Sequence, residues 1–102
     1  MSDVIVIGGG LAGCATAYYL ASDGVDVTLL ERFDLNTLAS GSNAGSLHAQ
    51  IAHEPFMRLG EGWAADYAPT VALLARSIGM WRTLGDELGA DLEVKLGGGL
   101  LV

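Results

Sequence analysis

The stretch from Val4 to Glu31 constrains the fold of this chain more than any other part of the sequence. It reads VIVIGGGLAGCATAYYLASDGVDVTLLE, in which an apolar run, a glycine-rich turn, a segment of helical character and a second apolar run follow one another. This order is typical of a β-α-β unit, in which a helix connects two parallel strands. We therefore predict strands over residues 4–7 and 26–30 and a helix over residues 11–22. The first strand is continuously apolar, which predicts that both of its faces are covered.

The glycines of this stretch have the spacing G-x-G-x-x-G, which is typical of a turn that binds a dinucleotide. Gly8 can turn the chain out of the first strand, Gly10 leaves room for a pyrophosphate, and Gly13 lets the helix approach the strand. The helix N-terminus then offers free N–H groups to phosphate oxygens. Glu31 ends the second strand, where its carboxylate can accept hydrogen bonds from a ribose. The alternative is a glycine-rich turn in an ordinary β-α unit, but the strand, helix and acid around the glycines favour the dinucleotide site.

The composition limits the chain to one small domain with an apolar core. The chain has 102 residues, of which 51% are hydrophobic and 17% are charged, and its formal net charge is −7. This negative charge argues against nucleic acid or an anionic membrane as a partner. No stretch approaches the ~20 apolar residues of a membrane span, and no basic segment of a signal peptide precedes the first apolar run. We therefore expect a soluble, cytoplasmic protein with no membrane span.

Cys14 is the single cysteine, so no disulfide can form within the chain. We interpret Cys14 as a small packing residue against the sheet; the alternative is a reactive thiol at a helix N-terminus. Because the sequence has no cluster of cysteines and histidines, we expect no metal site.

Residues 32–43 are rich in turn-forming side chains and predict a loop. Ser42 or Asn43 can N-cap a short helix that begins near Ala44. The segment at residues 39–48 carries many small hydrogen-bonding residues, which can contact a phosphate or a flat heteroaromatic ring. Taken in isolation, this segment is better interpreted as a solvated linker.

The second half of the chain is predicted to be helical. Apolar side chains recur at steps of three and four residues from Pro55 onwards. We expect Pro69 to begin the longer helix, which ends near Leu88, before Gly89. An alternating pattern predicts a strand over residues 92–96, followed by a turn at residues 97–99 and a further strand at residues 100–102.

Three segments resemble the N-terminal part of the FAD-dependent D-amino-acid oxidase superfamily, which includes glycine oxidase, sarcosine oxidase and the small subunit of bacterial D-amino acid dehydrogenase. They are DVIVIGGGLAGCATAYYLASDGVDVTLLER at Asp3–Arg32, ASGSNAGSL at Ala39–Leu47 and LGGGLLV at Leu96–Val102. The resemblance implies an α/β fold: a Rossmann-like dinucleotide-binding β-α-β unit followed by helices and the start of a substrate-domain β-sheet. It implies an FAD-binding unit with its flavin-contacting loop at residues 1–50, a helical segment at 51–90 and an incomplete sheet at 91–102.

The resemblance also implies which residues contact FAD. The glycine turn would line the pyrophosphate, Glu31 would hold the adenosine ribose, and Arg32 would lie at the adenine end. The second segment would contact phosphate or ring, and Leu47 and His48 would lie near the isoalloxazine; His48 is the one candidate for catalysis. The full cofactor-binding set is Gly8, Gly10, Leu11, Ala12, Gly13, Glu31, Arg32, Ser40, Ser42, Asn43, Ala44, Gly45 and Leu47.

The reaction implied by the resemblance is oxidation of a C–N bond in a small-molecule amine or amino acid. A hydride passes to the flavin, and the resulting imine hydrolyses. Family members are several times longer than 102 residues, and two parallel strands alone do not make a stable sheet. We therefore predict that the chain is a fragment of a larger two-domain flavoprotein, or that it needs a complementary chain.

Two alternatives remain open from the sequence. The chain can be a non-catalytic dinucleotide-binding fragment or subunit that completes a partner chain. It can also belong to an NAD-linked dehydrogenase, because Glu31 suits NAD as well as FAD. The segment Ala39–Leu47 is the sequence feature that argues against NAD.

Overall fold

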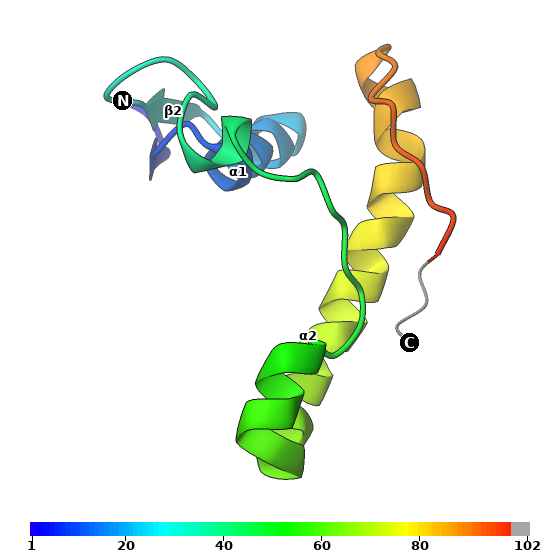
Figure 1. Ribbon diagram of the computed structural model, residues 1–102. Coiled ribbons are helices and arrows are strands. Elements are labelled where there is room, and N and C mark those ends of the chain that lie inside the picture. The colour runs from blue at the N-terminus through cyan, green and yellow to red at the C-terminus, as the bar shows by residue number, and fades with distance from the viewer. Residues whose placement is uncertain (99–102) are drawn as a thin grey trace. The chain divides into compact units, whose positions relative to one another are not determined.

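The computed structural model describes residues 1–98, and the chain divides into two compact units, Met1–Ser46 and Leu47–Val102. The first unit contains β1 (Val4–Ile7), α1 (Leu11–Ser22), β2 (Val27–Leu30) and a short 3-10 helix, η1 (Ala39–Gly41). The second unit contains one long helix, α2 (His53–Leu88) (Figure 1). The predicted strand at residues 100–102 and the last residue of the predicted glycine turn lie outside the described residues.

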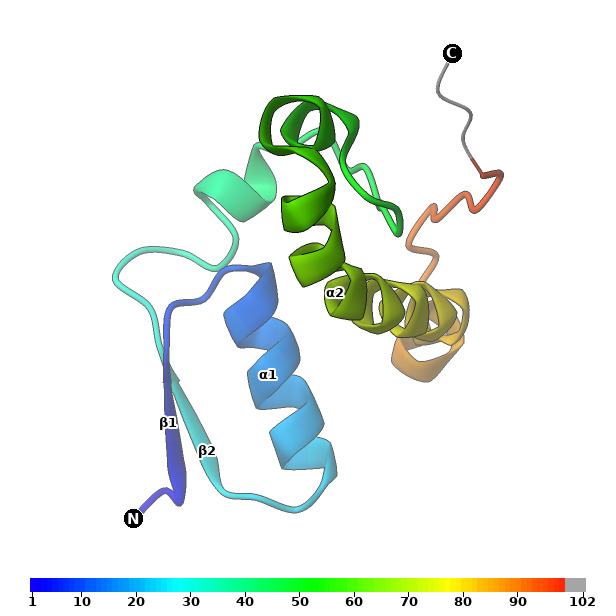
Figure 2. The same cartoon turned by 90° about the horizontal axis from the view of Figure 1, so that it is seen from below.

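The first unit is the β-α-β unit that the sequence predicts. β1 and β2 pair in parallel, with Val4 opposite Val27 and Ile7 opposite Leu30. The N–H of Gly8 extends this ladder by donating to the Leu30 carbonyl at 2.8 Å. Figure 2 shows the two strands side by side with α1 running beside them. The predicted α/β fold with its Rossmann-like start is therefore confirmed.

One face of the two-stranded sheet packs against α1. Val4 and Val6 are half-buried, whereas Ile5 and Ile7 are 60% and 86% exposed. Successive side chains of a strand point to opposite faces, so a continuously apolar strand needs a cover on both sides. Within the first unit, α1 covers one face of the sheet and leaves the other open. The expectation of cover on both faces is therefore not met within this unit.

The end of α1 follows from a local signal. Gly24 has a φ of +83°, its N–H donates to the Ala21 carbonyl, and the Val25 N–H donates to the Leu20 carbonyl, each at 3.0 Å. These bonds satisfy carbonyls that the helix end would leave free, in a conformation that glycine adopts without steric cost. The helix bounds predicted from the sequence are confirmed.

The predicted helix near Ala44 is wrong. Residues 43–49 contain no helix, and the short helical turn in this region is η1, which lies before Asn43. The Asn43 side chain bonds within its own loop: its Oδ1 accepts from the Gly45 N–H at 2.7 Å, and its Nδ2 donates to the Ser40 carbonyl at 2.6 Å. An asparagine that closes a turn in this way competes with the helix that it would otherwise cap.

The helix of the second unit begins earlier than predicted. It starts at His53, and Pro69 lies inside it. The break in the helical backbone falls at Gly60, where φ is +78° and ψ is −168°. Past this break the apolar stripe, made of the half-buried side chains that recur every three or four residues from Trp63 to Trp81, continues across Pro69. Trp63 stacks on Tyr67 one turn away, with ring centroids 5.0 Å apart. The prediction that Pro69 begins the longer helix is therefore wrong.

The C-terminal end of α2 agrees with its predicted end at Leu88. Gly89 has a φ of +63° and donates to the Asp86 carbonyl at 3.2 Å, while the Ala90 N–H donates to the Gly85 carbonyl at 3.0 Å. A left-handed glycine at this position ends a helix because it redirects the chain and satisfies the last carbonyls. None of the helices in the described chain is long and apolar enough to cross a membrane.

The strand predicted over residues 92–96 does not form within the described chain. Leu92 and Val94 are half-buried and alternate with exposed Glu93 and Lys95, as the pattern predicts. Glu93, however, has a φ of +54°, which interrupts an extended backbone. The segment also lacks a hydrogen-bonded neighbour strand among residues 1–98, and a strand is defined by such pairing.

Candidate dinucleotide-binding site

The glycine turn brings the start of α1 directly against the end of β1. Gly8 has a φ of +107°, which side chains other than glycine rarely adopt. A Cβ atom added at Gly13 would lie 1.8 Å from the Gly8 carbonyl oxygen and 3.5 Å from Val6 Cγ1. The helix can approach the strand this closely only because Gly13 has no side chain. These are the roles that the spacing predicts for the first and third glycines.

The N-terminus of α1 is suited to an anion. Its N-cap residue, Gly10, has no side chain with which to cap the helix, and the first turn carries no acidic residue. The N–H groups of a first helical turn have no acceptor within the helix, and the positive end of the helix dipole lies beside them. The N–H groups of Ala12 and Gly13 can therefore donate to phosphate oxygens. The backbone of this chain fits the pyrophosphate of a dinucleotide.

Glu31 is held at the edge of the same turn. Its Oε2 accepts from the Gly9 N–H at 2.6 Å, and its Oε1 accepts from the Phe33 N–H at 2.9 Å. The hydrogen bonds from Phe33 and then Gly9 hold the pKa of this carboxyl below its ordinary value, and the Arg32 charge acts in the same direction. A carboxylate offers about four lone-pair positions, so Glu31 can still accept from two ribose hydroxyls.

The lowered pKa of Glu31 predicts a pH-dependent contribution to stability. A carboxyl whose pKa is lowered on folding stabilises the native state above its ordinary value, here 4.5, and loses this effect as the pH falls through the folded pKa. We expect Glu31→Gln to unfold at a lower urea concentration than the parent protein at neutral pH, and the difference to shrink as the pH falls below 4.5. Urea unfolding at a series of pH values measures this. A difference that stays constant with pH would contradict the assignment.

The loop after β2 returns to the glycine turn through Ser40. Its Oγ accepts a hydrogen bond from the Leu11 N–H, the first N–H of α1, at 2.9 Å. The missing side chain of Gly10 faces the same hydroxyl, because a Cβ atom there would lie 3.0 Å from Ser40 Oγ. The structure thus brings these predicted residues to one site: Gly8, Gly10, Leu11, Ala12, Gly13, Glu31 and Ser40.

The remaining predicted residues of this loop are exposed to solvent. Ser42 donates its N–H to the Ala39 carbonyl at 3.3 Å, and Gly45 takes a φ of +67°. Ser42, Asn43, Ala44 and Gly45 are all exposed. Arg32 is also exposed, and its guanidinium carbon lies 4.6 Å from the centroid of the Phe33 ring.

Leu47 and His48 belong to the second unit. His48 is exposed, and its Nδ1 lies 3.3 Å from Gln50 Nε2. The described residues include no group of three or more metal-binding side chains.

Sequence reasoning missed four residues that shape this site. They are Gly9, Leu35, Asn36 and Gly41. Gly9 occupies a free position of the G-x-G-x-x-G spacing, and the other three lie in a segment whose residue types indicate only a loop. The signals that the sequence offers for them are the uninterrupted run of glycines at 8–10, the asparagine that precedes η1 and the glycine that ends it.

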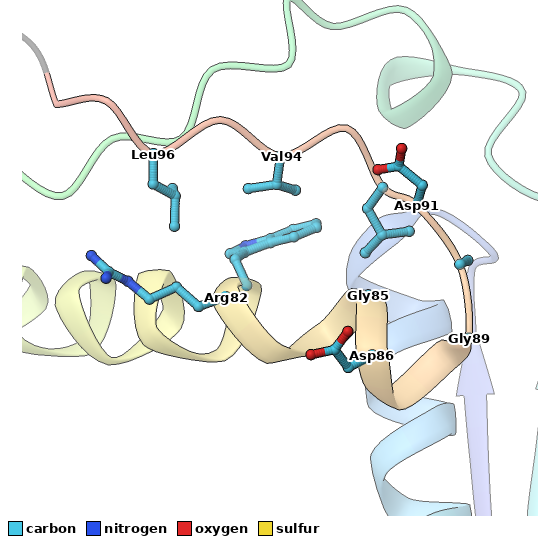
Figure 3. A pocket seen from close by; sticks show the side chains of 10 residues that line it. Arg82, Gly85, Asp86, Gly89, Asp91, Val94 and Leu96 are labelled. Carbon is cyan, nitrogen blue, oxygen red and sulfur yellow. The ribbon is translucent and has the colours of Figure 1, made fainter.

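The second unit contains a groove of about 740 Å³ between the last turns of α2 and the extended segment that follows (Figure 3). Its wall combines apolar side chains with Arg82, Asp86 and Asp91. The larger apolar members are Trp81, Leu92, Val94 and Leu96, of which Val94 and Leu96 point toward α2 from the segment that follows it. The groove lies within the size range of small-molecule sites, but it holds no nucleophile paired with a base.

Comparison with known proteins gives a family match over almost the whole chain. The profile of the family described as FAD dependent oxidoreductase (DAO) matches residues 3–102. A relative from Nitrosospira multiformis, named tRNA 5-methylaminomethyl-2-thiouridine biosynthesis bifunctional protein MnmC, is 42% identical over 85 residues. That match covers 83% of this chain and 14% of the relative.

Relatives of the same name are also found in other bacteria. The proteins from Burkholderia thailandensis and Burkholderia mallei are each 51% identical over 53 residues, which cover 51% of this chain and 8% of the relative. The chain therefore matches no more than about a seventh of the length of these relatives. No solved structure matches it.

Proposed function

The chain belongs to the FAD dependent oxidoreductase family, and we propose that it forms the FAD-binding portion of an enzyme that oxidises the C–N bond of an amine or amino acid. The observation that carries this proposal is the hydrogen bond from the Leu11 N–H to Ser40 Oγ at 2.9 Å. It joins the dinucleotide turn to the segment 39–47, which is the sequence feature that favours this family over NAD-linked enzymes.

The residues of the first unit would hold FAD by three kinds of contact. The N–H groups at the start of α1 would donate to the pyrophosphate. The Glu31 carboxylate would accept from the adenosine ribose, with Arg32 at the adenine end. The loop from Ser40 to Gly45 and the adjoining Leu47 would contact phosphate or ring. Bound FAD supplies the hydride acceptor for the reaction.

The protein's own part in this chemistry is binding and orientation. A substrate that arrives as a neutral amine needs no dedicated base, since no proton has to be removed from its nitrogen before the hydride leaves the adjacent carbon. His48 is the one titratable candidate near the ring in our proposal, and its exposed position leaves it accessible to a substrate.

We further propose that these residues act as part of a longer polypeptide or together with a complementary chain. The Nitrosospira multiformis relative is about seven times longer than its matched segment, and Ile5 and Ile7 of β1 are without cover within the first unit. In this arrangement residues 1–50 form the FAD-binding unit, 51–90 a helical segment and 91–102 the start of a substrate sheet.

A modified tRNA base is a second candidate substrate class. The relatives are named for the biosynthesis of 5-methylaminomethyl-2-thiouridine in tRNA, and a methylaminomethyl group contains C–N bonds of the kind that this family would oxidise. The net charge of −7 argues that any contact with tRNA phosphates is made outside these residues.

Two competing functions are a non-catalytic subunit that binds a dinucleotide and an NAD-linked dehydrogenase.

The first test is the visible spectrum of the purified and desalted protein, with the intact mass measured on the same sample. We expect a flavin spectrum that survives desalting, or uptake of added FAD in preference to NAD. Reduction of the bound flavin by an amine or a D-amino acid under anaerobic conditions then identifies the substrate class, and aminomethyl-modified tRNA is the comparison substrate. A protein that takes up NAD but no FAD would overturn the proposal.

A further inference from the structure

Gly9 uses both of its backbone polar groups within the protein. Its N–H donates to Glu31 Oε2 at 2.6 Å, and its carbonyl accepts from the Asn36 N–H at 2.9 Å and from Cys14 Sγ at 3.4 Å. The two lone pairs of the carbonyl are therefore both engaged. Gly9 is buried, so it differs from the neighbouring glycines, whose proposed task is to face a ligand.

The space around Gly9 is also filled. A Cβ atom at this position would lie 2.5 Å from Leu35 Cδ2, 3.0 Å from Glu31 Cβ and 3.1 Å from Glu31 Cγ. The end of the Leu35 side chain can rotate away. The Cβ atom of Glu31 is attached directly to the backbone after β2, so a side chain at position 9 presses on the Glu31 side chain, whose carboxylate accepts from the Gly9 N–H.

Asn36 connects Gly9 to the loop that carries Ser40. Asn36 has a φ of +60°, a left-handed conformation that asparagine adopts more readily than most residues. In this conformation its N–H points at the Gly9 carbonyl, while its own carbonyl faces η1, since a Cβ atom at Gly41 would lie 2.0 Å from the Asn36 oxygen. The turn at Asn36 therefore sets the position of η1 relative to the glycine turn.

We propose that Gly9 and Asn36 are positioning residues, which together hold the Glu31 carboxylate and the Ser40 hydroxyl in place before a dinucleotide binds. We call Gly9, Cys14, Glu31 and Asn36 the Gly9 clamp. This inference rests on the proposed function, because it assigns the clamp to a dinucleotide site. Groups that are ordered in advance cost less conformational entropy on binding, so a broken clamp lowers affinity even though Gly9 does not touch the ligand.

The test uses the full-length polypeptide that contains these residues, with FAD affinity measured by fluorescence titration of the ligand-free protein. Gly9→Ala is expected to bind FAD about tenfold more weakly, the size expected from the loss of one well-placed hydrogen bond to a charged group. Gly62→Ala is the matched control, because Gly62 lies inside α2 and a Cβ atom there meets nothing within 4 Å beyond its chain neighbours and the backbone of the helix itself. This control is expected to bind FAD as the parent protein does.

A double variant separates positioning from general destabilisation. If Gly9 acts through Glu31, Gly9→Ala combined with Glu31→Gln binds FAD no more weakly than Glu31→Gln alone. If the two losses instead multiply, Gly9 does not act through Glu31 and the clamp is refuted.

Substitutions at Asn36 test the other half of the clamp. Asn36→Gly keeps both the left-handed conformation and the N–H donor and is expected to retain FAD affinity. Asn36→Pro removes the donor and cannot adopt a positive φ, so it is expected to lose about tenfold or more in affinity. Equal affinity of these two variants would overturn the role of Asn36.

Hydrogen exchange of the ligand-free protein keeps the inference testable without FAD. Gly9→Ala is expected to speed exchange in residues 31–41 and to leave α2 unchanged. If the parent protein takes up no FAD, the proposed function fails, and the exchange rates alone decide whether the clamp exists. Unchanged exchange in residues 31–41 would refute it.

Discussion

Gly13→Ala is expected to abolish most of the FAD affinity of the protein. The added Cβ atom would lie 1.8 Å from the Gly8 carbonyl oxygen, which belongs to the backbone and cannot rotate away. The helix must then move off β1, and its first-turn N–H groups move with it. Overpacking of this kind costs about 1–3 kcal/mol, and an effect at the upper end corresponds to a loss of affinity of about 100-fold.

The measurement is an FAD titration of the ligand-free protein, accompanied by a thermal melt. Gly62→Ala introduces the same methyl group within α2, where a Cβ atom meets nothing within 4 Å beyond its chain neighbours and the backbone of the helix itself, and is expected to leave affinity unchanged. A Gly13→Ala protein that binds FAD within about twofold of the parent, a difference of less than about 0.5 kcal/mol, would show that α1 does not present its N-terminus to the cofactor.

Gly41→Ala is expected to weaken FAD binding while leaving the β-α-β unit intact. Its Cβ atom would lie 2.0 Å from the Asn36 carbonyl oxygen, so η1 must move away from the turn at Asn36. Ser40, the neighbouring residue, then loses its bond from the Leu11 N–H. We expect a loss of about tenfold or more, since the overlap of about 1–3 kcal/mol is partly relieved by movement of the loop.

Repeating the titration with NAD or AMP, neither of which carries a flavin, shows which half of FAD the loop contacts. If the loop at residues 39–47 contacts the flavin half of FAD, Gly41→Ala weakens FAD binding more than AMP binding. Gly79→Ala serves as the control in α2, because a Cβ atom there also meets nothing within 4 Å beyond its chain neighbours and the backbone of the helix. Equal losses for FAD and AMP would indicate that the loop acts only on the adenosine half, and the preference for FAD over NAD would lose its support.

The β-α-β unit could be predicted from the sequence because each of its signals is local. The glycine spacing, the two apolar runs and Gly24 each restrict the backbone within a few residues, and β1, α1 and β2 lie where these signals place them. The same holds for Gly89, whose left-handed conformation ends α2. A local signal with a steric cause is reliable because little outside the segment can override it.

The errors arise where several local signals compete. Pro69 suits the first turn of a helix, but the apolar stripe runs across it and the backbone breaks at Gly60 instead. Asn43 suits the cap of a helix at Ala44, but its side chain closes its own turn by accepting from the Gly45 N–H. Composition alone does not show which of two possible hydrogen bonds a polar side chain makes.

The contacts that assemble the candidate site could not be predicted, because they join residues that are far apart in the sequence. Glu31 reaches Gly9 over 22 residues, and Ser40 reaches Leu11 over 29 residues. Nothing in the residue types identifies Gly9 as the partner of both Glu31 and Asn36. The spacing predicts which residues would surround a dinucleotide, and the structure shows which of these residues bond to one another.

The open face of the two-stranded sheet has a consequence for handling this chain by itself. Within residues 1–98, β1 and β2 pair only with each other, so each also has a free edge, and Ile5, Ile7 and Leu30 are more than half exposed. Free edges with exposed apolar side chains recruit strands from other molecules. The isolated chain is therefore a candidate for edge-to-edge aggregation, which its net charge of −7 opposes by mutual repulsion and which added salt would promote by screening that charge.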